Sequence, residues 1–243
     1  MRADAFAIRL RRRGKLEAVD LGVRLCQSAA PSVFRCYLAV AVPFILLSLA
    51  SFEIATWLPT VAIWWAKPWL DRTVLFALSR AAFGQQTRPR DLWQAQRSVL
   101  WRQLFLTLTW RRLSPWRSLT QPVYQLEGLS IWKMRKRVLQ IRSGTTGTGL
   151  TITGAFSMIE AALTLALLSL ALWLVPGDVP IDWMRLFSED NVAVAFASAA
   201  AYGVVVAFLE PFYVAAGFAL YLNRRVELEA WDVEQELRRA FER

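Results

Sequence analysis

Two glutamates, Glu160 and Glu210, stand inside long apolar runs and are the residues of this sequence best placed to do chemistry. An unpaired charge inside such a run costs several kcal/mol, so intramembrane carboxyls mark proton relays, ion pathways or ligand sites. At 1.5 Å per residue, Glu160 lies about 12 Å and Glu210 about 18 Å from the cytoplasmic ends of their runs, so they can share a depth. Desolvation and like charge then favour neutral or proton-sharing carboxyls. One interpretation is a proton or cation relay, and the other is a structural pair of protonated carboxyls that bond across helices.

Few other residues offer chemistry. The sequence contains no His, which removes the commonest general base and metal ligand. Cys26 and Cys36 are its two cysteines and lack CxxC spacing, so we expect small apolar packing residues and not a redox pair. The glycine-rich stretch 143–154 has no GxxxxGK[ST] motif, so no phosphate loop is predicted. We therefore expect no enzyme, no cofactor and no metal site.

Composition predicts that the two glutamates lie in a membrane. The chain of 243 residues is 56% hydrophobic, has a mean hydropathy of +0.32 and contains 12 Trp, which is too apolar for an average soluble domain. The sequence has four apolar runs, at 33–52, 54–69, 155–175 and 192–222. The expected fold class is all-α: a polytopic membrane protein with about four membrane segments.

Two of the four runs have unusual lengths. The run 54–69 would make only about 24 Å of helix, and Pro59 and Pro68 interrupt it. A thin second span and a re-entrant hairpin both fit this pattern. The run 192–222 would extend about 46 Å against roughly 30 Å of hydrocarbon, so it must tilt, kink or protrude. Pro211 is the natural place for a kink.

The distribution of charge predicts the orientation. Residues 1–35 carry eight Lys and Arg against three acids, and residues 66–152 carry fifteen against three. The short segment 176–191 is acidic, with Arg185 as its one cation. By the positive-inside rule, the N-terminus and the middle region are cytoplasmic and 176–191 lies on the far side. The number of spans then places the C-terminus in the cytoplasm as well. Basic flanks beside spans explain the net charge of +10 without nucleic acid as a partner.

We predict five segments. The sequence places an amphipathic N-terminal segment on the cytoplasmic side of the membrane, then a helical hairpin in the membrane, basic interfacial helices, a pair of membrane helices and a C-terminal docking helix. Their ranges are 1–32, 33–69, 70–153, 154–222 and 223–243.

The middle region alternates apolar stripes with cations. Residues 91–113 predict an interfacial helix, 115–128 a loop and 143–154 a flexible hinge. Between the last two, a helix over 129–142 combines an apolar stripe with a cationic face that suits anionic lipid headgroups. A solvated face over a protein core is the alternative. The stripe contains Ile131, Met134, Val138 and Ile141, and the cations are Lys133, Arg135, Lys136 and Arg137.

The two ends of the chain share the pattern RRxxLEAxD, with six identities in nine positions. In a helix, the second Arg, the Glu and the Asp of each copy lie on one side. Chance is one explanation. The other is a pair of docking helices that contact each other or the basic middle region, with both aspartates buried against cationic partners. The two copies contain Arg12, Arg13, Glu17 and Asp20, and Arg224, Arg225, Glu229 and Asp232.

Four pieces of the chain resemble a family of uncharacterised bacterial inner-membrane proteins: LRRRGKLEAVDLGVRL, WWAKPWLDRTVLFALSRAAFG, RRLSPWRSLTQPVYQLEG and LYLNRRVELEAWDVEQELRR. Those proteins are met beside genes for a MoxR-type AAA ATPase and for transglutaminase-like membrane proteins. The tail is similar to the membrane domain attached to some glycerophosphoryl diester phosphodiesterases, whose catalytic domain and histidine are absent here. The resemblance implies a multi-pass inner-membrane partner of an ATPase-driven assembly.

Three functions are compatible with these patterns. The first is a non-enzymatic scaffold or component of a membrane complex, which recruits a protein partner at its cytoplasmic face. A small transporter or channel that uses Glu160 and Glu210 is the alternative. A membrane enzyme acting on lipid headgroups is the third, and it lacks a nucleophile–base pair or a metal cluster.

Overall fold

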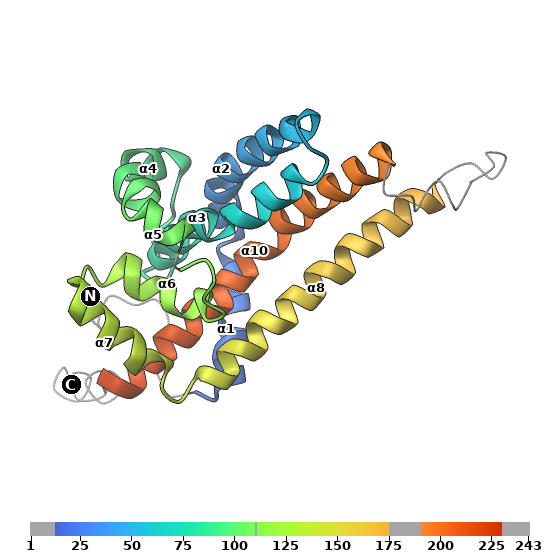
Figure 1. Ribbon diagram of the computed structural model, residues 1–243. Coiled ribbons are helices and arrows are strands. Elements are labelled where there is room, and N and C mark those ends of the chain that lie inside the picture. The colour runs from blue at the N-terminus through green and yellow to red at the C-terminus, as the bar shows by residue number, and fades with distance from the viewer. Residues whose placement is uncertain (1–12, 110, 175–190, 230–243) are drawn as a thin grey trace.

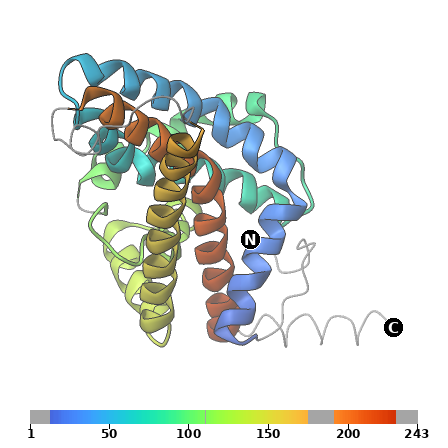
Figure 2. The same ribbon diagram turned by 90° about the vertical axis from the view of Figure 1, so that its right-hand side faces the viewer.

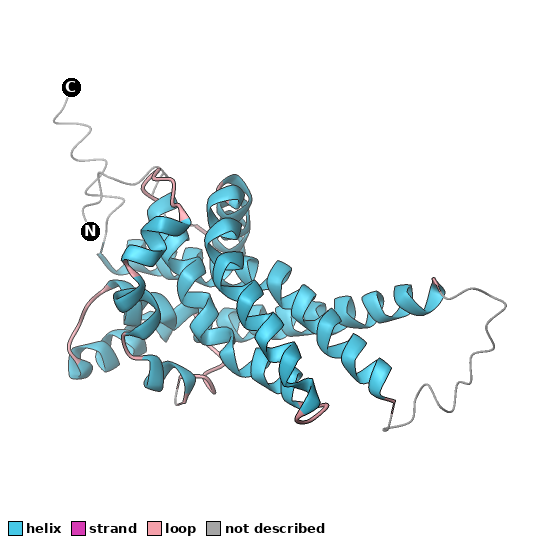
Figure 3. Ribbon diagram, turned by 90° about the horizontal axis from the view of Figure 1, so that it is seen from above, coloured by secondary structure: helices cyan, strands magenta, loops and turns pink. Residues whose placement is uncertain are grey.

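The structure is a computed structural model that describes residues 13–109, 111–174 and 191–229. Helices account for 83% of it, and the described ranges contain no strand (Figure 3), so the expected all-α class is confirmed. The elements in chain order are α1 (Lys15–Ser28), α2 (Ala30–Ala50), the 3₁₀ turn η2 (Ser51–Glu53), α3 (Leu58–Ala81), α4 (Pro89–Gln94), the π-helical turn η3 (Arg97–Trp101), α5 (Leu104–Leu108), α6 (Arg117–Leu126), α7 (Ile131–Arg142), α8 (Thr146–Trp173) and α10 (Val192–Glu229).

Three described helices are long and apolar enough to cross a membrane: α2 with its terminal turn (Ala30–Glu53), α8 and α10. They contain the apolar runs expected at 33–52, 155–175 and 192–222. The end of α2, the end of α8 and the start of α10 point toward the same side of the molecule, and α7 lies at the opposite end (Figure 1). The spans and the smaller helices therefore occupy different parts of the molecule.

The second apolar run forms the first half of a longer helix. We expected Pro68 to interrupt this run, but α3 continues from Leu58 to Ala81 with Pro68 inside it. A proline removes one backbone donor, and tertiary packing compensates here because residues 70–75 of α3 are all buried. The Gln121 side-chain amide also donates to the carbonyl of Pro68, at 3.1 Å.

The helix α10 is the central element. It is long and apolar enough to cross a membrane, and nearly every residue from Leu209 to Asn223 is buried, because α1, α2, α3, α6 and α8 pack on it. Figure 2 shows α10 between α1 and α8. The second half of the helix therefore lies inside a helical domain, with no break in the helix at Pro211.

The N-terminal helix packs against α10 instead of lying free on a membrane surface. Its buried residues are Ala18, Gly22 and Cys26. A Cβ at Gly22 would overlap the carbonyl oxygen of Ala215 on α10, so this small-residue face lets the two backbones approach closely. Leu16, an apolar residue of the first turn, is exposed.

The expected interfacial helix over 91–113 is broken into α4, η3 and α5. Gln103 adopts a left-handed conformation, with φ of 59°. Side chains of α3 bind the carbonyls that the break leaves free: Trp69 Nε1 donates to Leu100 O at 3.2 Å, and Arg72 Nη1 donates to Arg102 O at 2.6 Å. Buried groups of α3 therefore determine where this segment turns.

Two segments that we expected to be irregular are helical. The predicted loop 115–128 contains α6, and residues 117–123 of that helix are buried. The predicted hinge 143–154 contains the first turns of α8. Gly149 is needed there because a Cβ would lie 2.8 Å from Trp116 Cδ1, and Thr153 Oγ1 donates to Pro115 O at 2.6 Å. These contacts fix the base of α8, so the hinge prediction was wrong.

Candidate functional site: a buried ion-pair cluster and its cavity

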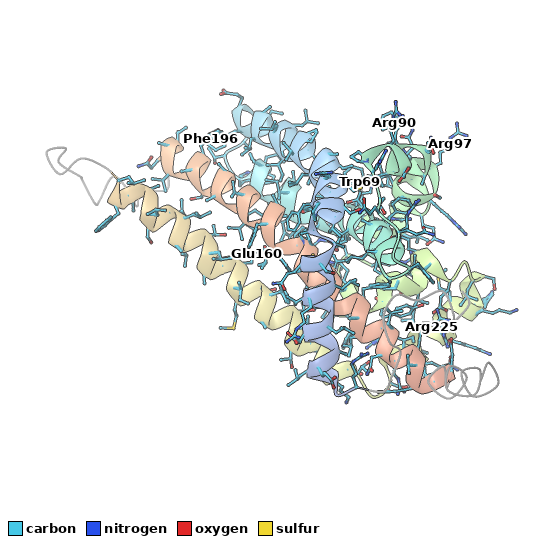
Figure 4. The ribbon with its side chains drawn as sticks, turned by 180° about the vertical axis from the view of Figure 1, so that it is seen from behind. Trp69, Arg90, Arg97, Glu160, Phe196 and Arg225 are labelled. Atoms are coloured by element: carbon cyan, nitrogen blue, oxygen red, sulfur yellow. The ribbon has the colours of Figure 1, made fainter. Side chains whose placement is uncertain are left out.

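The two intramembrane glutamates meet at a lysine. Lys67 Nζ on α3 lies 2.5 Å from Glu160 Oε2 on α8 and 2.8 Å from Glu210 Oε2 on α10. The Lys67 and Glu210 side chains are buried, and Glu160 lies on the side of α8 that faces α10 (Figure 4). Glu160 and Glu210 contact the same lysine, which agrees with the expectation that they share a depth. Their pairing with a cation replaces the carboxyl pair that we expected.

An arginine from α6 extends the cluster. Arg117 Nη2 donates to Glu210 Oε1, and its Nε lies 2.9 Å from Asp71 Oδ2, an ion-pair contact without hydrogen-bond alignment. Burial disfavours the charged form of Arg117, but Asp71 and Glu210 outweigh it and raise the pKa of the guanidinium. Helices α3, α6, α8 and α10 thus each contribute charge to one buried network.

Local sequence places these groups. Lys67 and Asp71 are four residues apart and lie on the same face of α3. Tyr213, three residues after Glu210, supports the arginine from α10, because Arg117 Cζ lies 5.1 Å from the centre of its ring. The Tyr213 hydroxyl is 3.1 Å from Thr153 Oγ1 on α8. Because each partner is held by packing, the cluster is preorganised.

A second arginine, Arg112, lies beside this network and makes no ion pair with any described residue. Arg112 is 8% exposed, and its Cζ stacks 3.7 Å from the centre of the Trp64 ring. Its Nε and Nη2 are buried and make no hydrogen bond. Burial lowers the pKa of Arg112 and the nearby Arg117 lowers it further, and these two effects outweigh the opposite effect of the carboxylates of Asp71 and Glu210.

Both arginines and both glutamates line a cavity of about 270 Å³ between α3, α8, α10 and the segment before α6. Trp64, Leu113, Phe156 and Leu209 give it apolar walls, and Ser114 and Ser157 contribute hydroxyl groups. A cavity of this kind accommodates a small charged group that enters from an apolar surface. Among the described residues, no cluster of three or more His, Cys, Asp or Glu side chains is arranged to hold a metal ion.

Comparisons with protein-family models, curated proteins and solved structures find no match for this chain.

The repeated motif of the two chain ends is only partly within the described residues. Arg12 and Asp232 lie outside them. Asn223 joins the ends of α1 and α10, because its side chain accepts from Arg13 N at 3.0 Å and donates to Arg13 O at 3.1 Å. The remaining acids differ in their contacts: Arg13 pairs with Glu17, Asp20 with Arg24, Arg224 with Glu227, and Arg225 with Glu229.

Asp20 is exposed, with 58% of its side chain accessible, so the prediction that it is buried against a cation was wrong. It lies on the face of α1 away from α10, because the small residues of α1 occupy the contact. Glu229 behaves as expected of a docking residue, since Arg137 of α7 donates to it and also binds Glu127 at 3.0 Å.

The cationic helix over 129–142 packs its stripe on protein. Met134, Val138 and Ile141 are buried in the core, and the side chain of Ile131 is not described. Lys133, Arg135 and Lys136 are exposed, whereas Arg137 makes the ion pairs with α6 and α10. The structure thus agrees with a polar face over a protein core, and headgroup binding by these cations stays a prediction.

Sequence reasoning missed Lys67, Asp71, Arg112 and Arg117. The basic residues fell within segments whose charge a positive-inside pattern already explains. One signal was available, because Lys67 interrupts the apolar sequence WWAKPWL and a cation there needs a carboxylate.

Proposed function

We propose that this protein is a non-enzymatic component of a bacterial inner-membrane complex, and that it presents a rigid helical platform to a protein partner in the cytoplasm. The observation that carries the proposal is the outer face of α7. Trp132 is 80% exposed and Leu139 57% exposed, beside the exposed cations Lys133, Arg135 and Lys136. Trp and Arg side chains are enriched at protein contact sites, and Trp132 and Arg135 lie three residues apart on this helix.

The position of α7 favours a protein over lipid headgroups as its partner. With 38 residues, α10 is about 57 Å long, whereas the hydrocarbon layer is roughly 30 Å thick. Glu229, at the inner end of α10, binds Arg137 of α7. If α10 stands near the membrane normal, α7 lies about 25 Å beyond the hydrocarbon. The partner on this proposal has an acidic surface, and the family resemblance implies an AAA ATPase of the MoxR type.

The proposed topology has four membrane segments, both termini in the cytoplasm and residues 176–191 on the far side. Besides α2, α8 and α10, the remaining segment is α3, which is second in chain order. It has 24 residues and is about 36 Å long, enough to cross the membrane. Its outer half carries exposed Trp64 and Trp65, and its inner half is covered by protein. This arrangement supports a complete second span over a re-entrant hairpin.

A transporter that uses Glu160 and Glu210 has less support from the geometry. A relay needs carboxyls that load and release a proton or cation. Here both oxygens of Glu210 and one oxygen of Glu160 contact Lys67 or Arg117, and these contacts hold the two glutamates in ion pairs.

Labelling of single cysteines tests the topology. Ser143→Cys should react with a membrane-impermeant maleimide only from the cytoplasmic side, and Ser188→Cys only from the far side. The wild-type chain is a silent background, because Cys26 and Cys36 are buried and burial raises the pKa of Cys26 to about 12, which leaves little reactive thiolate at neutral pH. Reaction of Ser143→Cys from the far side would overturn the orientation.

A photo-crosslinking amino acid tests the platform. Placed at position 132 in cells, it should form an adduct with one protein whose yield falls when Lys133 and Lys136 are both changed to Glu. The matched control is position 158, because Met158 on α8 is 76% exposed and lies in a span, where lipid is expected to surround it. If position 132 gives only lipid adducts, or none, the partner proposal fails.

A further inference from the structure

We propose that the cavity beside the ion-pair cluster binds a phosphate group, as a free anion or as the headgroup of an inner-leaflet phospholipid, and that Arg112 is the residue that holds it. The inference does not depend on the protein platform of α7, which contacts α10 at Glu229, 19 residues after Glu210.

One charged residue of the cavity wall, Arg112, is not in a direct ion pair with any described residue. Five charged residues line it, and four of them are in ion pairs: Lys67 with Glu160 and Glu210, and Arg117 with Glu210 and Asp71. Arg112 makes no ion pair in the part of the chain that the structure describes. A buried cation without a partner costs several kcal/mol, so a bound anion would remove a penalty that the fold otherwise carries.

The chemistry of the side chain selects phosphate. Two nitrogens of Arg112, Nε and Nη2, lack acceptors, and they form the edge of the guanidinium that binds two oxygens of one phosphate in parallel. Trp64 covers the face of the guanidinium and so fixes its plane. Ser114 and Ser157 line the same cavity and offer hydroxyl donors.

The size and depth of the cavity suit a headgroup. At about 270 Å³ it is smaller than the 300–1,000 Å³ typical of sites for whole drug-sized ligands. Counted from the far-side ends of their helices, Glu210 lies 18 residues and Glu160 13 residues in, about 27 Å and 20 Å, so the two glutamates lie in the inner half of a roughly 30 Å hydrocarbon layer. The phospholipid phosphates nearest to them are those of the inner leaflet. Basic pockets between membrane helices on this side are known to take anionic headgroups.

The experiment uses the purified full chain in detergent and follows its thermal unfolding during titration. The ligands are dioleoylphosphatidylglycerol, dioleoylglycerol with the same acyl chains and no phosphate, and inorganic phosphate. The variants are Arg112→Gln and, as a matched control, Arg135→Gln on the exposed face of α7. A ligand that binds the folded state raises the unfolding temperature in proportion to its occupancy.

We expect the phospholipid to raise the unfolding temperature of the wild type and of Arg135→Gln, and dioleoylglycerol to raise neither. Arg112→Gln should bind the phospholipid at least about tenfold more weakly, since hydrogen bonds to a charged group are lost. Without ligand, Arg112→Gln should unfold at the same temperature as the wild type or higher, because an unpaired buried cation is removed. A merely structural arginine would lower it.

The ligand arms distinguish the two sources of phosphate. Protection by phosphatidylglycerol alone identifies a lipid headgroup, and equal protection by millimolar inorganic phosphate identifies the free anion. The proposal is overturned if neither phosphate compound protects, if dioleoylglycerol protects as well as the phospholipid, or if Arg112→Gln responds like the wild type.

Discussion

Replacing Arg117 by Met is expected to destabilise the folded protein by about 3–5 kcal/mol, because the change leaves buried carboxylates without their cation. Asp71 has no other ion pair among the described residues and is 0% exposed. Glu210 keeps Lys67, so most of the cost comes from Asp71. The measurement is the free energy of unfolding of the purified protein in mixed detergent micelles.

The second variant of this experiment adds Asp71→Asn to Arg117→Met. The amide carries no charge, so the double variant should recover more than about 1 kcal/mol relative to the sum of the single variants. Arg135→Met removes an exposed arginine and should change stability by less than about 0.5 kcal/mol. Strictly additive single effects would show that the two side chains do not interact.

Replacing Gly217 by Ala is expected to cost about 3 kcal/mol, near the upper end of the usual range for over-packing. A Cβ at Gly217 on α10 would overlap Cβ, Oγ and the backbone carbonyl carbon of Ser118 on α6. The helix α6 must then move away from α10. Because Ser118 follows Arg117, the same movement loosens the contact between Arg117 and Glu210.

Gly154→Ala is the matched control for this change. Gly154 is also helical, and a Cβ there meets nothing within 4 Å. Alanine has the higher helix propensity, so this variant should be more stable by about 0.5–1 kcal/mol. Chemical denaturation of both variants provides the comparison, and a loss of similar size at the two positions would contradict the close approach of α6 to α10.

The membrane runs were the part of the fold that sequence predicted best. An uninterrupted apolar run of about 20 residues has few alternatives to a spanning helix, and α2, α8 and α10 follow from that rule. The residues at which the helices begin and end could not be predicted from the apolar runs. Pro68 and Gly149 have sequence signatures of interruption, yet packing against α6 holds both inside helices. Tertiary contacts of this kind override local propensity.

The site was predictable only in part, for a similar reason. Glu160 and Glu210 stand out because nothing nearby in the sequence neutralises them. Their partners come from distant segments: Lys67 and Arg117 each lie 93 residues from the glutamate that they bind. Arg117 was hidden in an expected loop, and only the burial of α6 against α10 brings it to the cluster. Arg112 stands out because it is buried and has no ion-pair partner among the described residues, and the sequence shows neither feature.

The continuity of α10 has a mechanical consequence. In the proposed topology, a single helix of about 57 Å joins the far side of the membrane to the α7 surface and would act as a lever arm. A rotation of about 10° around its outer end displaces Glu229 by about 10 Å. Membrane helices change their inclination when bilayer thickness changes, and in this topology the contact between Arg137 and Glu229 would transmit such a change to α7. The proposed platform would then respond to bilayer thickness.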